Sequence, residues 1–179
     1  MRNGQLSRIA GATALILVFA AGVAQAADTP DAWVTIKTKI ALMTTEGVST
    51  KDLNVDTVNG VVTLHGKVAT EAEKAEAENV ARGIEGAKQV KNLLQVVPSA
   101  QRAVVERSDD LIKKGVEAAF NANRRVNTSG IKVASVNKGV VLLSGKTKSL
   151  EAYLESVEVA NAVRGVRRVS TEVEVVPAS

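Results

Sequence analysis

The chain has 179 residues, of which 45% are hydrophobic and 23% charged, and its formal net charge is +4. This balance is typical of a globular protein and excludes an intrinsically disordered one. The sequence contains no cysteine, which excludes disulfides and thiolate-ligated metal sites. Aromatic residues make up only 2% of the chain, so we expect cores built from Val, Ile, Leu and Ala.

The N-terminal segment has the three parts of a secretory signal peptide. Arg2 and Arg8 give it a positive start, an apolar run follows over residues 12–21, and an Ala-x-Ala cleavage site ends at Ala26. The run is too short to span a bilayer comfortably, and no later segment is long and apolar enough to do so. We therefore expect residues 1–26 to be removed and the mature chain, which has no cysteine for a lipid anchor, to be a soluble periplasmic protein. The alternative is a retained N-terminal anchor.

The residues that follow the leader predict a helix. Thr29 suits the N-cap position, Pro30 the first helical position and Asp31 the positive end of the helix dipole. Apolar residues then recur with helical spacing and form one face of the helix, namely Trp33, Ile36, Ile40 and Met43. Glu46 and Gly47 mark the end of this helix.

A β-hairpin comes next. Residues 53–57 alternate as a strand, and Asn59-Gly60 is a strong signal for a two-residue type I′ turn, because both central positions of that turn need positive φ. Val62 and Leu64 then share one face of the returning strand. The sequence therefore predicts two antiparallel strands joined by a tight turn.

The chain returns to the sheet through a second helix. A capping box opens this helix at residues 70–73, and Gly86 closes it. Its acidic residues have helix-surface spacing and are interpreted as a solvated face: Glu71, Glu73, Glu76 and Glu78. Residues 90–96 alternate as a third strand, which Pro98 ends, so the predicted order is helix, strand, strand, helix, strand.

The whole pattern occurs twice. An offset of 79 residues places three early glycines on three later ones, and matched glycines mark backbone positions that a Cβ would disturb. These six structural glycines are Gly60, Gly66, Gly86, Gly139, Gly145 and Gly165. The best offset is 76 in the first helix and 78 in the first strand, which predicts insertions in the helix–strand loop and in the hairpin turn. Ser108 is predicted to cap the first helix of the second copy.

These patterns predict an α+β protein with two tandem α-β-β-α-β domains after the signal peptide, each a two-layer sandwich. The first domain is expected over residues 28–98, a linker over 99–107 and the second domain over 108–177. A unit of this size is small but can fold around one two-layer core. Strand order, the packing of the two domains and the oligomeric state are left open.

The repeated hairpin resembles the BON domain family. The resemblance rests on residues 59–66, which read Asn-Gly-Val-Val-x-Leu-x-Gly, and on Gly-Ala-x-x-Val at residues 86–90. Both copies match, so the resemblance covers nearly all of the mature chain. It implies an α/β sandwich without catalytic residues and a role in envelope maintenance, osmotic stress and contact with phospholipid surfaces. The second copy has Lys138 where the first has Asn59, so a longer turn and a turn of another type both stay possible there.

The sequence offers no catalytic, cofactor-binding or metal site. His65 is the only histidine, and it lies on the strand face opposite Val62 and Leu64, which favours a solvent-side strand residue. It has no cysteine or second histidine as a partner, and Ser144 replaces it in the second copy, which argues against metal ligation and a nucleophilic triad. No Gly-rich phosphate motif is present either. We expect no enzyme and no cofactor, and a buried polar cleft joining the two copies would count against this expectation.

The two copies differ in charge and in one helix face. Residues 27–101 contain 8 basic and 10 acidic residues, whereas residues 102–179 contain 13 and 9. On the second helix of the later copy, apolar residues stand where the first copy has Glu71, Lys74 and Glu78, and three arginines follow that helix. Together they define a candidate surface for lipid or a protein partner: Leu150, Tyr153, Val157, Arg164, Arg167 and Arg168. Three interpretations stay open, namely packing against the first copy, contact with a protein, and contact with an anionic bilayer.

The leader, the repeat and this surface favour a non-enzymatic periplasmic protein of envelope and osmotic stress, which binds anionic phospholipid or envelope proteins weakly. The alternative is a chaperone-like or scaffolding protein for secreted polypeptides. Salt would weaken lipid contact but not apolar contact with a client protein. Nucleic acid is not expected as a partner, because an exported protein is separated from nucleic acid and few aromatic residues are available for stacking.

Overall fold

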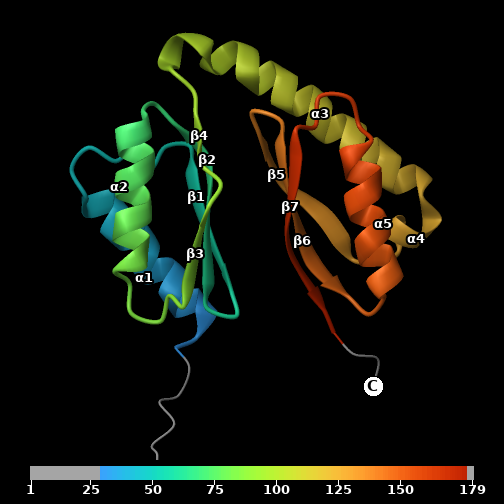
Figure 1. Cartoon of the computed structure of the whole chain (residues 1–179), viewed down its shortest axis with the longest axis horizontal. Coiled ribbons are helices and arrows are strands. Elements are labelled where there is room, and N and C mark those ends of the chain that lie inside the picture. The colour runs from blue at the N-terminus through green and yellow to red at the C-terminus, as the bar shows by residue number, and fades with distance from the viewer. Residues whose placement is uncertain (1–28, 177–179) are drawn as a thin grey trace, which may run out of the picture.

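Figure 1 shows two α+β units that lie side by side and are joined by a long helix. The computed structural model describes residues 29–176, and the predicted signal peptide, residues 1–26, lies outside them. In each unit the helices cover one face of a sheet, and the other face of that sheet turns toward the neighbouring unit (Figure 1). The predicted α+β class, with two tandem two-layer units, is confirmed.

The first unit has the predicted order, with one difference in its last strand. Its elements are α1 (Asp31–Thr44), β1 (Leu53–Val58), β2 (Val61–Val68), α2 (Glu71–Arg82), β3 (Gln89–Asn92) and β4 (Gln95–Val96). β1 and β2 form an antiparallel hairpin, and α2 carries the chain across the sheet so that β3 and β4 pair parallel to β2. The third strand is interrupted because the Asn92 side chain bonds locally, accepting the Leu94 N–H at 3.1 Å and donating to the Glu78 carboxylate at 2.9 Å.

The second unit repeats this order with an unbroken last strand. Its elements are α3 (Arg102–Ala122), α4 (Arg124–Asn127), β5 (Ile131–Asn137), β6 (Val140–Thr147), α5 (Leu150–Asn161) and β7 (Arg168–Val175). The sheet order is β5-β6-β7, with β6 and β7 parallel over eight paired residues. Thr171 stands where the first unit has Asn92, so no side-chain amide interrupts this ladder.

α3 begins earlier than the sequence predicted. Its first residue is Arg102, so Ser108 lies inside the helix and does not cap it. A 3₁₀ turn at Ser99–Gln101 leads directly into α3. The helix extends back this far because residues 99–114 contain no glycine or proline to end it. α3 therefore reaches from the first unit to the second, across the residues that were expected to form a linker (Figure 1).

Both hairpins close with the same two-residue turn. Asn59 and Gly60 have φ values of 53° and 79°, and Lys138 and Gly139 have values of 49° and 75°, so the second turn is neither longer nor of another type. The insertion predicted in the second turn lies instead in β5, where a β-bulge at Ala134 shifts the pairing register. A bulge accommodates one extra residue while the rest of the ladder keeps its pairing.

One aspartate in each unit connects the first helix to the hairpin turn. Asp31 accepts the backbone N–H groups of Asn59 and Gly60 at 2.7 and 2.8 Å. Asp109 makes the same pair of bonds to the second turn at 2.9 and 3.0 Å. The two aspartates are 78 residues apart in the sequence, so the first helices superimpose at this offset and not at the predicted 76.

Each unit has its own apolar core. In the first unit α1 buries Val34, Thr38 and Leu42, which are spaced by four residues, against the inward strand face that carries Val62 and Leu64. The prediction that Val62 and Leu64 share a face is confirmed. The second core repeats this arrangement around Ile112, Val116, Phe120, Val141 and Leu143.

The prediction that Glu73 belongs to a solvated face of α2 is wrong. Its side chain is buried, and its two carboxylate oxygens accept the N–H groups of Ser49 and Ala69 at 2.6 and 2.7 Å. The Thr70 hydroxyl accepts the Glu73 N–H at 3.1 Å, so the predicted N-cap is confirmed. The carboxylate therefore satisfies backbone donors and does not face solvent.

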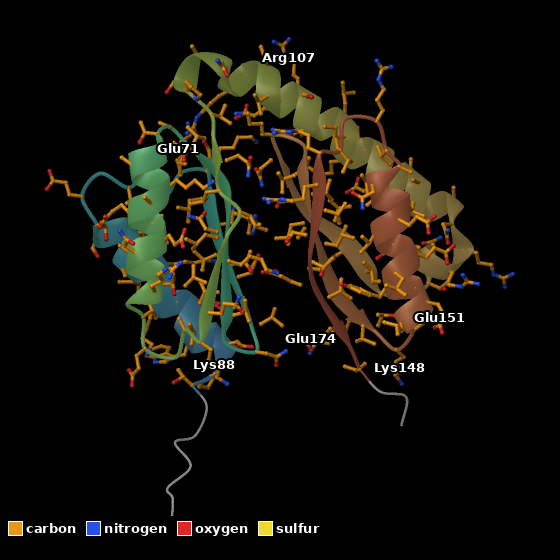
Figure 2. All side chains as sticks on the ribbon, in the orientation of Figure 1. Glu71, Lys88, Arg107, Lys148, Glu151 and Glu174 are labelled. Atoms are coloured by element: carbon orange, nitrogen blue, oxygen red, sulfur yellow. The ribbon has the colours of Figure 1, made fainter. Side chains whose placement is uncertain are left out.

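The two units meet sheet to sheet. Leu93, Val140 and Leu142 are each at most 7% exposed, yet they belong to neither core. Strand alternation places Leu142 opposite the core residues Val141 and Leu143, on the face that turns toward the first unit. Side chains from both sheets fill the space between the units (Figure 2). The interface therefore has an apolar centre of its own.

Three lysines add polar links across this interface. The Lys67 ammonium lies 3.1 Å from the Asp109 carboxylate, with only 11% and 5% of the two side chains exposed. Lys91 donates to the backbone carbonyl of Thr171 at 3.2 Å. Lys138 donates to the carbonyl of Val96 at 3.1 Å, which gives the lysine of the second turn a role between the units.

Candidate functional site: the outer face of α1

The apolar face predicted for the first helix points away from the protein core. Its members remain strongly exposed: Trp33 at 55%, Ile36 at 46%, Ile40 at 57% and Met43 at 70%. At 100° per residue these four side chains fall within about 80° of the helix circumference. The sheet covers the other side of α1, so this stripe faces outward as a continuous apolar surface.

Two lysines flank the apolar stripe. By helix geometry Lys37 lies beside Trp33 and Ile40, whereas Lys39 lies on the opposite border beside Met43. Lys37 pairs with Glu85 at 3.4 Å on the surface. Lys39 is exposed and makes no hydrogen bond or ion pair with the part of the chain that the structure describes. An apolar stripe bordered by cations is the pattern of a helix that lies on an anionic surface.

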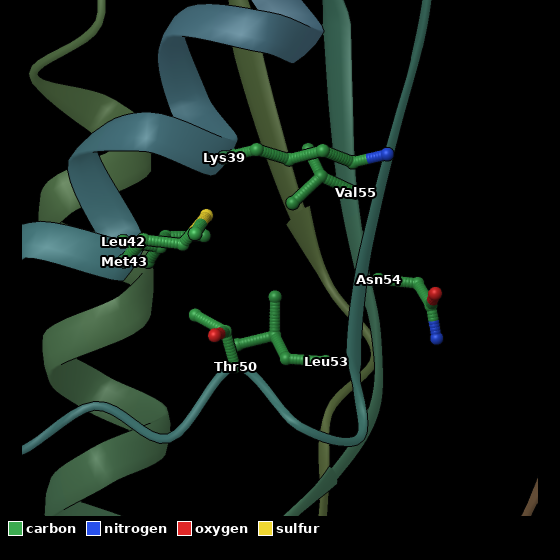
Figure 3. Close-up of a pocket in the computed structure, with 7 residues that line it drawn as sticks. All are labelled: Lys39, Leu42, Met43, Thr50, Leu53, Asn54 and Val55. Atoms are coloured by element: carbon green, nitrogen blue, oxygen red, sulfur yellow. The ribbon is translucent and has the colours of Figure 1, made fainter.

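A cleft opens at the C-terminal end of the stripe, between α1 and β1. Figure 3 shows the residues that line it: Lys39, Leu42, Met43, Thr50, Leu53, Asn54 and Val55. Its floor is aliphatic, because Leu42, Leu53 and Val55 are buried. Met43 belongs both to the cleft and to the exposed stripe, so the two features form one continuous surface.

The second unit lacks this stripe. The offset of 78 places Leu111 on Trp33, and Leu111 is 71% exposed. The other three stripe positions correspond to Lys114, Ala118 and Asn121. The large apolar surface on a first helix therefore belongs to the first unit only.

The surface predicted on the second unit does not form one patch. Tyr153 and Val157 are half-buried against the core of their own unit, and the Tyr153 hydroxyl lies 3.2 Å from that of Thr171. Leu150 is 54% exposed at the first turn of α5, whereas the arginines follow the helix, about 18 Å further along its axis. These arginines are exposed: Arg164, Arg167 and Arg168.

The interpretation that this α5 stripe packs against the first unit is wrong. α5 lies on the outer side of its sheet and contacts β6, β7, α3 and α4 of its own unit. Its apolar residues accompany a local change in partner. Asn92 of the first unit donates to the Lys74 carbonyl and the Glu78 carboxylate, whereas Thr171, which replaces Asn92, lies beside the hydroxyl of Tyr153, which replaces Lys74. The polar-to-apolar difference between the copies therefore reflects helix–strand packing at these two positions.

A polar cluster lies between the two units. His65 is on the predicted strand face, but it is 6% exposed because the second unit covers it, so the solvent-side assignment is wrong. Its Nε2 lies 2.8 Å from the Asp56 carboxylate. Thr63 is fully buried beside it, and a cleft between the units is lined by Asp56, Ser144 and Glu172. Among residues 29–176, no three His, Cys, Asp or Glu side chains are placed to hold a metal ion.

A polar cleft between the units counts against an inert protein, and the pKa values of its carboxylates are shifted. Asp56 is half-exposed and has its pKa lowered mainly by the hydrogen bond from His65. Burial raises the pKa of Glu172, and the Asp56 carboxylate raises it further, against the opposite effects of Thr63, His65 and Lys91. The pKa values of these two carboxyl groups are thus shifted in opposite directions.

Glu172→Gln is expected to stabilise the protein at neutral pH. A carboxyl group with a raised native pKa weakens the folded state above that pKa, and the penalty disappears as pH falls below the unfolded-state value of about 4. The free energy of unfolding in urea, measured from pH 7 to pH 4, should show the variant ahead at pH 7 and the two proteins converging at acid pH. A difference that stays constant with pH would contradict this assignment.

The comparisons with known proteins agree with this architecture. The BON domain family matches residues 30–98 and again residues 108–177. Osmotically-inducible protein Y of Escherichia coli is 32% identical over 145 residues, which cover 80% of this chain and 72% of that protein. The outer membrane lipoprotein DolP of Haemophilus influenzae is 31% identical, and a 21 kDa hemolysin of Actinobacillus pleuropneumoniae is 33% identical. Each of these two matches covers 65% of this chain and 59% of the other protein, which is less than two thirds of its length.

The likeness to solved structures is weak. The C-terminal domain of CdsD, a structural protein of the type III secretion system of Chlamydia trachomatis, matches 83% of this chain and 68% of its own, with a TM-score of 0.33 and 16% identity. Such values carry no inference. Within residues 29–176, no helix has the length and apolar content needed to cross a membrane. The repeated hairpin, the two matched segments and the identity to osmotically-inducible protein Y show that this chain belongs to the BON domain family and contains two BON domains in tandem.

Proposed function

We propose that this protein is a non-enzymatic, periplasmic protein of envelope and osmotic stress that binds anionic phospholipid surfaces, with the outer face of α1 as the main contact. The observation that carries the proposal is the exposed stripe of Trp33, Ile36, Ile40 and Met43 between two lysines. Relatives named as an osmotically inducible protein and as an outer membrane lipoprotein support a place in the cell envelope. The leader supports export, with cleavage after Ala26.

The size of the stripe suits reversible membrane association. An apolar side chain moved fully out of water contributes about 1.5–3 kcal/mol, and a lysine near an anionic surface adds about 1 kcal/mol. A helix lying in the interface buries only part of each side chain. The sum supports weak, salt-sensitive binding, consistent with the weak affinity expected from the sequence. The exposed arginines after α5 (Arg164, Arg167 and Arg168) are a second candidate contact, and Leu150 at the other end of α5 is a separate one.

Vesicle binding tests the proposal. Co-sedimentation with phosphatidylglycerol vesicles should detect the wild-type protein, and Trp33→Glu with Ile40→Glu should weaken binding by about 100-fold or more, because two inserted side chains are lost and two negative charges added. Leu111→Glu, at the corresponding position of the second unit, is the matched control and should bind as the wild type does. Unchanged binding by the double variant would refute α1 as the contact.

The α5 surface has its own test. Leu154 is 57% exposed on α5, so Leu154→Glu with Arg167→Glu removes apolar area and charge there without entering the core. Loss of vesicle binding in this variant, with normal binding by the α1 variant, would move the contact to the second unit.

Binding of secreted polypeptides is a second candidate function. It is favoured by further exposed apolar side chains on the other helices: Val104 and Leu111 on α3, and Leu150 and Leu154 on α5. Such scattered surfaces suit a chaperone-like or scaffolding protein. Capture of an unfolded client should persist at high salt, whereas capture of anionic vesicles should fall as salt screens the lysines.

A further inference from the structure

The cleft between α1 and β1 is built like a site for an apolar chain end. Leu42, Leu53 and Val55 form its floor and walls, and Thr50, Asn54 and Lys39 stand at its rim (Figure 3). Its volume is about 200 Å³. This is too small for a whole acyl chain, so a bound chain would leave the cleft and continue along the apolar stripe.

The position of the cleft joins it to the face that is proposed to meet the membrane. Met43 is 70% exposed on the stripe and also lines the cleft. Methionine is flexible and adapts to differently shaped apolar partners. A helix lying on a bilayer through this stripe would therefore bring the mouth of the cleft to the lipid surface.

Charge at the rim indicates the kind of head group. In Figure 3 the Lys39 side chain extends from α1 across Val55, with its ammonium beyond the apolar floor. The hydrogen bond from His65 is the main cause of the lowered pKa of Asp56, and the charge of Lys39 has a smaller effect in the same direction. That carboxylate is already hydrogen-bonded to His65 at 2.8 Å, which leaves the Lys39 ammonium available to an anion outside.

We propose that this cleft binds the chain end of a single anionic monoacyl amphiphile, whose head group meets Lys39. The inference rests on the proposed phospholipid contact of α1 and adds a discrete site to it. Two sources share this chemistry, namely a free fatty acid and a lysophospholipid. An aliphatic side chain of a partner protein is the competing occupant.

Titration with monomeric amphiphiles tests the site. Decanoate and lauroyl-lysophosphatidylglycerol, each below its critical micelle concentration, are titrated by calorimetry, and methyl NMR signals of Leu53 and Val55 report the location. We expect saturable binding of at least one of them with shifts at both methyl groups, and the ligand that binds more tightly identifies the source. Lys39→Gln should lower the affinity for the anion by about fivefold, the effect of one surface charge, and abolish its advantage over lauroyl-lysophosphatidylcholine.

A matched pair of variants separates the cleft from the membrane face. Thr50→Phe places a ring into the cleft that Thr50 lines, whereas Ser49→Phe adds the same ring to an exposed neighbour that does not line it. Thr50→Phe should lower monomer affinity by about tenfold or more because the site is filled, with vesicle co-sedimentation within about twofold of the wild type. Ser49→Phe should leave both unchanged and serves as the folding control.

The outcomes distinguish this proposal from the one on which it rests. Vesicle binding without monomer binding refutes the proposed cleft site and leaves the proposed membrane contact in place. Equal monomer affinity in wild type and Thr50→Phe also overturns the cleft. Monomer binding without vesicle binding keeps the cleft and overturns the membrane contact. Shifts of the same methyl groups by an aliphatic peptide, and not by either amphiphile, assign the cleft to a protein partner and overturn the proposal.

Discussion

Replacing Gly66 with alanine is expected to lower the free energy of unfolding by about 3–5 kcal/mol, the combined cost of an unfavourable φ and of overpacking. Gly66 has a φ of +125°, and a Cβ built on it would lie 1.9 Å from the backbone oxygen of Asp52. Backbone atoms of a neighbouring segment cannot move aside as a flexible side chain can. Gly145 has the same geometry in the second unit, with φ of +129° and 2.2 Å to the oxygen of Gly130, so Gly145→Ala should cost a similar amount.

Gly47→Ala is the matched control for these two variants. Gly47 also has positive φ, at +80°, but nothing lies within 4 Å of a Cβ placed there. Its replacement should therefore cost about 1–2 kcal/mol, the strain of the left-handed conformation alone. Urea unfolding followed by far-UV circular dichroism gives the three values. Equal costs for Gly66→Ala and Gly47→Ala would show that close approach of the backbone does not matter at Gly66.

Asp109→Ala is expected to cost about 3–5 kcal/mol, because it leaves the buried ammonium of Lys67 without its partner. It also leaves the turn N–H groups of Lys138 and Gly139 without the carboxylate that accepts them at 2.9 and 3.0 Å. Asp31 makes the same two bonds to its own turn but no ion pair with the described residues. Asp31→Ala should therefore cost only about 1–3 kcal/mol.

The difference between these two variants measures the link between the units. In a double-mutant cycle, Lys67→Met in the Asp109→Ala background should recover part of the loss, because the unpaired charge is removed. Urea unfolding of the four proteins supplies the cycle. Equal costs for Asp31→Ala and Asp109→Ala, with no recovery in the double variant, would mean that the Lys67–Asp109 pair does not hold the two units together.

The order of elements and the duplication could be predicted from the sequence because they depend on local chemistry. Asn59-Gly60 admits a two-residue turn wherever it occurs, and the structure finds both residues at positive φ. The capping threonine of α2 and the alternation around Val62 and Leu64 are equally local. The position of a one-residue insertion could not be predicted in this way. The residues on either side of the β-bulge at Ala134 alternate as in a regular strand, so the sequence does not reveal the bulge.

The direction of α1 could not be predicted in this way. Its sequence is apolar on two sides, with Val34 and Leu42 on one and Trp33 and Ile40 on the other. Periodicity finds both faces but does not say which of them the sheet covers. The decisive signal is the paired aspartates, because Asp31 and Asp109 fix the rotation of each first helix by binding the hairpin turn. Aligning these aspartates would have placed Trp33 outside.

The contact between the two units could not be predicted from the alternation of individual strands either. His65 and Thr63 follow an apparently solvated alternation, yet the open face of the second sheet covers them. Likewise, the sequence shows that Tyr153 differs from Lys74, its counterpart in the first unit, but the partner of Tyr153 is Thr171 in the same unit. Both errors arise because a sequence shows which residues share a face and not what lies opposite that face.

The fluorescence of Trp33 tests the membrane contact of α1 most directly. The sequence contains one tryptophan, it is 55% exposed in the free protein, and it is the first residue of the proposed contact stripe. On addition of phosphatidylglycerol vesicles its emission maximum should move to shorter wavelength, and brominated acyl chains should quench it. An emission spectrum that stays unchanged while the protein co-sediments with the vesicles would contradict the account.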